Sequence, residues 1–140
     1  MSPRGCIFCA IVAGTAPSER VYEDERVLSF MDIQPVGDGH LLIVPKAHFE
    51  SLLEADEPSL LAVMRVSRRL AHALERALAP DGIAVHQLNG AAAGQTVFHY
   101  HMHLIPRRLG TQLEVHSRVR GDDAELRRMA ERLRSALGGA

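Results

Sequence analysis

The spacing of apolar residues predicts two helices, a long one in the middle of the chain and a second one near its end. The first should run from about residue 57 to 79, with Asp56 as its N-cap and Pro58 in its first turn. The second should span residues 122–137. The residues expected to face inward are Leu60, Met64, Ser67, Leu70, Ala71, Leu74 and Leu78 in the first helix, and Leu126, Met129, Ala130, Leu133 and Leu137 in the second.

Short apolar runs bounded by turn residues predict strands around these helices, the first two forming a hairpin. The expected strands are residues 21–23, 27–31, 41–44, 82–88 and 97–105, with Pro45 and Pro106 ending the third and the last. Residues 6–13 are typical of a short helix or turn, and residues 32–39 and 89–94 of loops. The fold class is therefore α+β: a mostly antiparallel sheet with one long helix packed on it and a C-terminal helix.

The last expected strand carries three histidines at strict alternation: His99, His101 and His103. Successive side chains of a strand point to opposite faces, so these imidazoles share one face, with neighbours about 7 Å apart. The residues between them are apolar and can lie on a core. Imidazole changes its charge near neutral pH and can act as a nucleophile, an acid–base group or a metal ligand. Packing alone does not account for this pattern.

Composition narrows the class of protein. The chain has 140 residues, of which 46% are hydrophobic and 24% charged, as expected for one globular domain with its own core. Its formal charge of −1 argues against nonspecific binding to nucleic acid through phosphate neutralisation. No apolar run approaches the roughly 18–20 residues that a membrane helix needs. With no signal-peptide pattern at its start, the protein is expected in the cytoplasm.

The two cysteines, Cys6 and Cys9, form a CxxC motif at the start of the chain. In a cytosolic protein such a motif indicates redox chemistry or metal binding. The redox motif normally follows a core strand, and nothing resembling a strand precedes Cys6. A structural zinc site needs four ligands. Taken alone, the pair is half of a zinc site or a reduced pair without a function.

A loop rich in glycine and alanine leads directly into the histidine strand. Glycine lets a backbone approach a ligand closely, and amide and hydroxyl side chains can donate hydrogen bonds to phosphoryl oxygens. An ordinary turn is the alternative interpretation. The position of the loop favours a site, because its donors would meet the imidazoles. The candidate donors are Asn89, Gln95 and Thr96.

The segment around the three histidines resembles a known family. Residues 94–107 resemble the signature of the histidine triad (HIT) superfamily, in which three histidines alternate with apolar residues. Residues 30–33 and 39–48 resemble the same family, and residues 6–14 look like its bacterial Hint-like branch. The resemblance implies a single domain over residues 1–140, with a core at about 5–107 and a helical tail at about 108–140.

The resemblance implies a role for each histidine of the site. His101, the middle one, would attack the α-phosphorus of a nucleotide and form a covalent nucleotidyl-histidine that water later hydrolyses. His103 would donate to a phosphoryl oxygen, with the loop donors beside it. His99 would orient the reacting group, and His40 matches a histidine that supports the triad. The remaining His72, His86 and His116 are interpreted as structural.

The resemblance also implies how the nucleotide and a metal are held. Asp32 would accept hydrogen bonds from the ribose hydroxyls, although core packing is the alternative for the apolar residues that match the base pocket. Zinc would be a structural, noncatalytic cofactor that fixes the N-terminus to the histidine strand. The base pocket would comprise Ile7, Phe8, Ile11, Phe30, Ile33 and Leu42, and the zinc ligands Cys6, Cys9, His48 and His99.

The expected activity is hydrolysis of a purine nucleoside phosphoramidate, and the expected assembly is a homodimer. The alternative substrates are dinucleoside polyphosphates, as in Fhit-like members, which residues 104–107 also resemble. Two interpretations of a different class stay open: a nucleotide-binding regulatory module with incidental turnover, and a zinc-stabilised interaction domain without turnover. No membrane or nucleic-acid partner is expected.

Overall fold

The computed structural model describes residues 4–112, 114 and 116–138, and in this part of the chain five strands and three α-helices are found. A short 3₁₀ turn, Ala91–Ala93, precedes the last strand. The elements in chain order are α1 (Ile7–Ala13), β1 (Arg20–Glu23), β2 (Val27–Met31), β3 (Leu41–Pro45), α2 (Glu57–Leu78), β4 (Gly82–His86), β5 (Met102–Arg107) and α3 (Asp123–Gly138).

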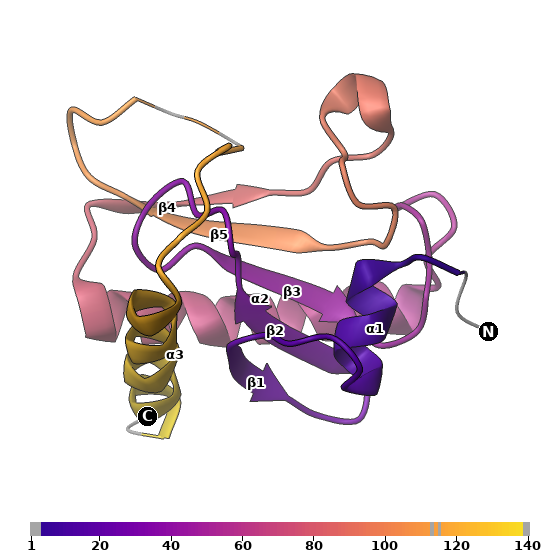
Figure 1. Ribbon diagram of the computed structural model, residues 1–140, viewed down its shortest axis with the longest axis horizontal. Helices are drawn as coiled ribbons and strands as arrows, with labels where there is room; N and C mark the ends of the chain where they lie inside the picture. Colours follow the sequence, from indigo (N-terminus) through magenta and orange to yellow (C-terminus); the bar gives the residue numbers. More distant parts are fainter. Residues whose placement is uncertain (1–3, 113, 115, 139–140) are drawn as a thin grey trace.

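The strands form one antiparallel sheet in the order β1-β2-β3-β5-β4 (Figure 1). Leu41 of β3 pairs with Met31 on one side and with Leu104 on the other, which fixes the register at the middle of the sheet. The histidine strand β5 is therefore internal, and β4 is an edge strand. This architecture confirms the predicted α+β fold class.

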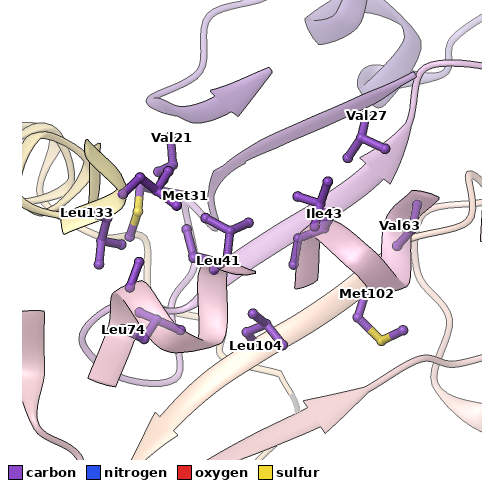
Figure 2. Close-up of a cluster of buried hydrophobic side chains, with 14 of the residues drawn as sticks. Val21, Val27, Met31, Leu41, Ile43, Val63, Leu74, Met102, Leu104 and Leu133 are labelled. Carbon is purple, nitrogen blue, oxygen red and sulfur yellow. The ribbon is translucent and has the colours of Figure 1, made fainter. Parts of the chain in front are cut away.

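The two faces of the sheet bury different sets of residues because strand side chains alternate. On one face, α2 and α3 cover the larger core (Figure 2), to which β5 contributes Met102 and Leu104, the residues on either side of His103. On the other face, α1 packs on β2 and β3 and forms a smaller cluster. That cluster consists of Phe8, Ile11, Leu28, Phe30, Leu42 and Val44. The imidazoles of His101 and His103 lie on this second face, beside α1.

The long helix begins as predicted, with the side chain of Asp56 accepting a hydrogen bond from the Ser59 amide at 2.9 Å. The predicted inward stripe was partly wrong. Met64 is 53% exposed, whereas Val63 and Val66 are buried against the sheet. The buried face of α2 is therefore rotated relative to the predicted one, and it packs against both the sheet and α3.

The histidine strand is shorter at its start and longer at its end than the predicted 97–105. It begins at Met102, because the Tyr100 amide donates to the carbonyl of Phe49 rather than to a neighbouring strand. It continues through Pro106, which pairs with Ile83 of β4. On its other side β5 is paired only up to Leu104, which lies opposite the first residue of β3. A proline is tolerated where a strand has a neighbour on one side only.

The other differences at element ends are small. The edge strand β4 stops at His86, two positions before the predicted end, and α3 runs one residue later than predicted at both ends. Among the described residues, no helix combines the length and the apolar composition needed to cross a membrane.

Candidate functional site

A cavity of about 330 Å³ opens on the α1 face of the sheet, between α1, the loop after β2 and the start of β5. One part of its wall is apolar and the other carries imidazoles. The lining includes ten of the predicted nucleotide-site residues: Ile7, Phe8, Ile11, Phe30, Asp32, Ile33, Leu42, Thr96, His101 and His103. A volume of this size is at the lower end of the range for small-molecule sites.

His101 has a fixed orientation and a fixed tautomer. Its Nδ1–H donates to the backbone carbonyl of His99 at 2.6 Å, which leaves the lone pair on Nε2. The ring is only 7% exposed, and the edge contact with Phe8 has a centroid distance of 5.0 Å. Burial lowers the pKa of His101 below its ordinary value. The imidazole is therefore neutral at pH 7, as a nitrogen nucleophile must be.

A chain of hydrogen bonds sets the tautomer of His103. The Val36 amide donates to Nδ1 of His40 at 3.1 Å, so the proton of neutral His40 is on Nε2. That Nε2–H donates to Nδ1 of His103 at 2.9 Å, so the proton of neutral His103 is on its own Nε2. This Nε2 is buried and has no hydrogen-bond partner within the described structure. Burial lowers the pKa of His40 to about 4, and it lowers the pKa of His103 as well.

The unpartnered Nε2–H of His103 is the donor that the site offers to a ligand. A buried donor without a partner costs free energy, and in native proteins such a group usually has a functional reason. His101 and His103 lie side by side, with a centroid distance of 4.9 Å. The pair therefore presents a nucleophilic nitrogen and a hydrogen-bond donor to the same cavity.

Asp32 lies at the first turn of the loop after β2. Its Oδ1 accepts a hydrogen bond from the Gln34 amide at 2.8 Å, while Oδ2 lies 3.4 Å from Nε2 of His40. The side chain is 18% exposed, and burial raises the pKa of its carboxyl group. Asp32 is thus a carboxylate at the wall of the cavity with one oxygen held by the backbone.

Two of the predicted loop donors do not line the cavity. Asn89 accepts from the Leu52 amide and exchanges hydrogen bonds with Gln87. Gln95 is buried, and its amide donates to the carbonyls of Glu50 and Val97. The structure brings only Thr96 of the three loop residues to the cavity, because the two amides are engaged in shaping the loop.

A second cluster joins the N-terminus to the segment before β5. Its four members are the predicted set Cys6, Cys9, His48 and His99, whose donor atoms all lie within 4.8 Å of one another. The Cys6 side chain also accepts from the Cys9 amide and so caps α1, which explains why the CxxC motif opens a helix. The cysteines are free thiols rather than a disulfide.

The geometry of this cluster fits a tetrahedral metal. Zinc–sulfur bonds of about 2.3 Å and zinc–nitrogen bonds of about 2.0–2.1 Å put neighbouring donors about 3.3–3.8 Å apart. Nδ1 of His99 lies 3.4 Å from the Cys6 sulfur, 3.5 Å from the Cys9 sulfur and 3.2 Å from Nδ1 of His48. The Nε2–H of His99 donates to the Pro45 carbonyl at 2.8 Å, which leaves the lone pair of Nδ1 facing the cluster.

Sequence reasoning missed one part of the cavity wall. His116, Ser117 and Arg120, from the segment between β5 and α3, also line it. His116 was interpreted as structural, yet its ring centroid is 6.2 Å from that of His103. The available signal was the polar composition of this segment, because His116, Ser117 and Arg120 all carry hydrogen-bond donors.

Comparison with known proteins shows the family of this chain. The sequence model of the HIT domain matches residues 13–110. The chain is 46% identical over 102 residues to "Protein hit" of Bacillus subtilis, covering 73% of this chain and 70% of that protein.

Two solved structures match nearly the whole chain. A zinc-bound histidine triad family protein from Mycobacterium smegmatis has a TM-score of 0.86 and 39% identity, and 96% of this chain and 94% of that chain are covered. A hypothetical histidine triad nucleotide-binding protein from Sulfolobus tokodaii has a TM-score of 0.88 and 31% identity, with 96% and 93% covered. The match to these two structures thus extends beyond the residues that the family model covers. The chain belongs to the HIT domain family.

Proposed function

We propose that the protein is a nucleotide hydrolase or transferase that attacks the α-phosphate of a purine nucleotide through a covalent nucleotidyl-His101. One observation carries this proposal. The lone pair on Nε2 of a neutral His101 lies in the same cavity as the unpartnered Nε2–H of His103. A nucleophile and a preorganised donor are what phosphoryl transfer needs, because charge develops on the phosphoryl oxygens.

The two steps make different use of these residues. In the first, Nε2 of His101 bonds to the α-phosphorus while His103 donates to a phosphoryl oxygen. The bond to the leaving group breaks with its electron pair on the leaving atom, and an amine leaving group takes up a proton from water. In the second, water attacks the same phosphorus and the bond to Nε2 breaks, which releases the nucleoside monophosphate. The carbonyl of His99 holds Nδ1–H of His101 through both steps and stabilises the positive imidazole that forms.

The remaining cavity wall fits a nucleoside. The rings of Phe8 and Phe30 pack edge to face at 5.4 Å and form, with Ile11 and Leu42, an apolar surface for the base. Asp32 would accept from the ribose hydroxyls through Oδ2, the oxygen that does not accept from the Gln34 amide. Its partial burial supports this role, because burial deprives the carboxylate of water. The ribose hydroxyls would supply hydrogen bonds in place of that water.

We propose zinc as the metal of the second cluster. The two thiols, the two imidazoles and their spacing support zinc, as does the zinc-bound relative from Mycobacterium smegmatis. Cys6, Cys9, His48 and His99 would hold it, and it would supply a structural link between α1 and the segment before β5. The His99 carbonyl that orients His101 would then be held in place by the metal.

The preferred leaving group is an amine, as in nucleoside phosphoramidates. Dinucleoside polyphosphates are the second candidate, because the same attack on the α-phosphorus cleaves them and because a basic segment lines the cavity.

A homodimer is also proposed. The edge strand β4 carries Val85, which is 54% exposed, and Leu53 protrudes from a loop that is bonded to Asn89 just beyond this strand. An exposed strand edge with apolar side chains favours pairing with a second copy. Light scattering on the purified protein would report the mass, and a monomer would contradict this part of the proposal.

Replacement of His101 by alanine tests the enzymatic function. The enzyme proposal predicts loss of turnover of adenosine phosphoramidate with binding of AMP retained. A regulatory module predicts that the variant keeps its cellular effect, and an interaction domain predicts unchanged binding of a protein partner. His72→Ala is the matched control, because His72 is exposed on α2, away from the cavity, and should turn over like the wild type.

A further inference from the structure

Asp32 and His40 are the first and last residues of the loop between β2 and β3, and they are bonded to each other. The amide of Asp32 donates to the carbonyl of His40 at 3.1 Å. The strand residues next to them, Met31 and Leu41, are paired in the sheet. The carboxylate that lines the cavity and the buried imidazole of His40 are therefore held side by side.

Neutral His40 has one N–H, and two acceptors lie close to it. The Val36 amide donates to Nδ1, which puts the proton on Nε2. Nδ1 of His103 lies 2.9 Å from this Nε2, and Oδ2 of Asp32 lies 3.4 Å from it. The first distance is that of a normal hydrogen bond, and a shift of about 0.5 Å would give the carboxylate the same distance. The proton of His40 can thus be donated to either residue.

Water on Oδ2 of Asp32 keeps the carboxylate from taking this proton in the free protein. A carboxylate is the stronger acceptor of the two, because hydrogen bonds to charged groups are about twice as strong as those between neutral groups. The side chain of Asp32 is 18% exposed, so water reaches it. Burial raises the pKa of its carboxyl group, which indicates that the carboxylate is already short of water. With Oδ2 solvated, His40 donates to His103.

A bound nucleoside would remove that water. Asp32 lines the same cavity as Phe30 and Ile33, so a base and a sugar in this cavity would exclude water from the carboxylate. Ribose hydroxyls would replace the lost water as donors, whereas a sugar without hydroxyls would leave Oδ2 buried and unpaired. An unpaired buried charge is costly. The Nε2–H of His40, at 3.4 Å, is then the donor at hand.

Transfer of this hydrogen bond would weaken the donor that faces the phosphate. His103 carries its proton on the unpartnered Nε2 because its Nδ1 accepts from His40. Accepting at Nδ1 also polarises the ring and strengthens Nε2–H as a donor. When His40 donates to Asp32 instead, the proton of His103 is no longer confined to Nε2. Stabilisation of the charge on the phosphoryl oxygens is then reduced.

We propose that Asp32 is a positioning residue for phosphoryl transfer, through which the ribose hydroxyls maintain the hydrogen bond from His40 to His103. The site would then discriminate against nucleotides without these hydroxyls in the rate of the chemical step as well as in binding. Such discrimination is expected where a missing substrate hydroxyl leaves a buried polar group unpaired. This inference rests on the proposed function, the attack by His101 on a bound nucleotide.

The first test measures single turnovers of adenosine phosphoramidate and of its 2′,3′-dideoxy analogue, with protein in saturating excess. This rate constant is independent of substrate affinity and of product release. In wild type it should be about tenfold lower for the dideoxy substrate, the effect of one hydrogen bond. In Asp32→Ala the two rate constants should be equal, because the acceptor that competes with His103 is absent. The matched control Asp38→Ala removes an exposed carboxylate of the same loop that does not line the cavity, and it should keep the wild-type ratio.

Imidazole ¹⁵N NMR spectra test the hydrogen bond without turnover. Two-bond ¹H–¹⁵N correlations show which nitrogen of a histidine carries the proton, and the signals of His103 are assigned with His103→Gln. Wild type saturated with adenosine should keep the proton of His103 on Nε2, whereas 2′,3′-dideoxyadenosine should give a mixture of the two forms. Neither nucleoside carries a phosphate that could contact His103. Asp32→Ala should show the same proton position with both nucleosides.

The outcomes separate this inference from the proposed function. Equal rate constants for the two substrates in wild type would overturn the inference while the attack by His101 stands. The same proton position on His103 with both nucleosides would overturn it as well. Absence of turnover of either substrate would refute the proposed function instead, and the spectra would still test the hydrogen bond. If urea titration shows Asp32→Ala unfolded, the two wild-type comparisons decide.

Discussion

Replacing His40 by alanine should impair catalysis although His40 does not line the cavity. The residue is buried and connects the Val36 amide to Nδ1 of His103. Without its Nε2–H, nothing keeps the proton of His103 on the nitrogen that has no protein partner. A lone pair rather than a donor can then meet the phosphoryl oxygen, and loss of one such donor costs about 100–1,000-fold in kcat.

The same substitution should lower stability by an amount that the structure allows us to estimate. Two buried groups, the Val36 amide and Nδ1 of His103, lose their partner. Each unsatisfied buried group costs about 1–3 kcal/mol, so the free energy of unfolding should fall by about 2–6 kcal/mol. This is a large part of the roughly 5–15 kcal/mol typical of a domain, so the variant must be assayed where urea titration shows it folded.

The conservative variant His40→Gln separates catalysis from stability. The glutamine amide can donate to Nδ1 of His103 and hold its tautomer, so kcat with adenosine phosphoramidate should recover most of the loss. Turnover and urea unfolding are measured for both variants and for His72→Ala. A folded His40→Ala with the kcat of wild type would refute the catalytic role of the hydrogen-bond chain.

Three further predictions concern the metal, pH and ribose recognition. Elemental analysis should find equimolar zinc in the wild type and none in Cys9→Ser, whose Tm should also be lower; equal zinc in both proteins would contradict the cluster. The contribution of His40 to the free energy of unfolding should be constant above about pH 6.5 and fall by about 1.4 kcal/mol per pH unit as pH decreases toward about 4. Stability falls with decreasing pH in this range because His40 binds a proton in the unfolded protein that the folded protein excludes. Urea titrations in which His40→Gln shows the same pH slope as the wild type would refute this prediction. Asp32→Asn should lose about tenfold or more in preference for AMP over its 2′-deoxy analogue, measured by calorimetry. An undiminished preference would remove Asp32 from ribose binding.

The parts of the fold that depend on local pattern could be predicted from the sequence. Alternation placed His101 and His103 on one face and the apolar residues between them on the other, because the period of two follows from the strand backbone itself. The start of β5 could not be predicted in this way. It is set by the hydrogen bond from the Tyr100 amide to the carbonyl of Phe49, a contact far away in the sequence.

The site also has parts that could be predicted from the sequence and parts that could not. The apolar residues and Asp32 that the resemblance indicated line one cavity. The orientation of Asn89 and Gln95 instead depends on the backbone of residues 50–52, which no local pattern reveals. His116 was missed for a related reason. Irregular chain carries no periodicity, and the course of residues 116–121 is fixed by single hydrogen bonds to the carbonyls of Gly94 and Ile33.

The most direct measurement is detection of the covalent intermediate. Wild-type protein is mixed with adenosine phosphoramidate, stopped in alkali within the first turnover, and its peptides are mapped by mass spectrometry. The account predicts an adenylyl group on the peptide that contains His101, and none in the His101→Ala variant. Turnover of the substrate without an adduct on His101, or with an adduct on another residue, would contradict the central claim.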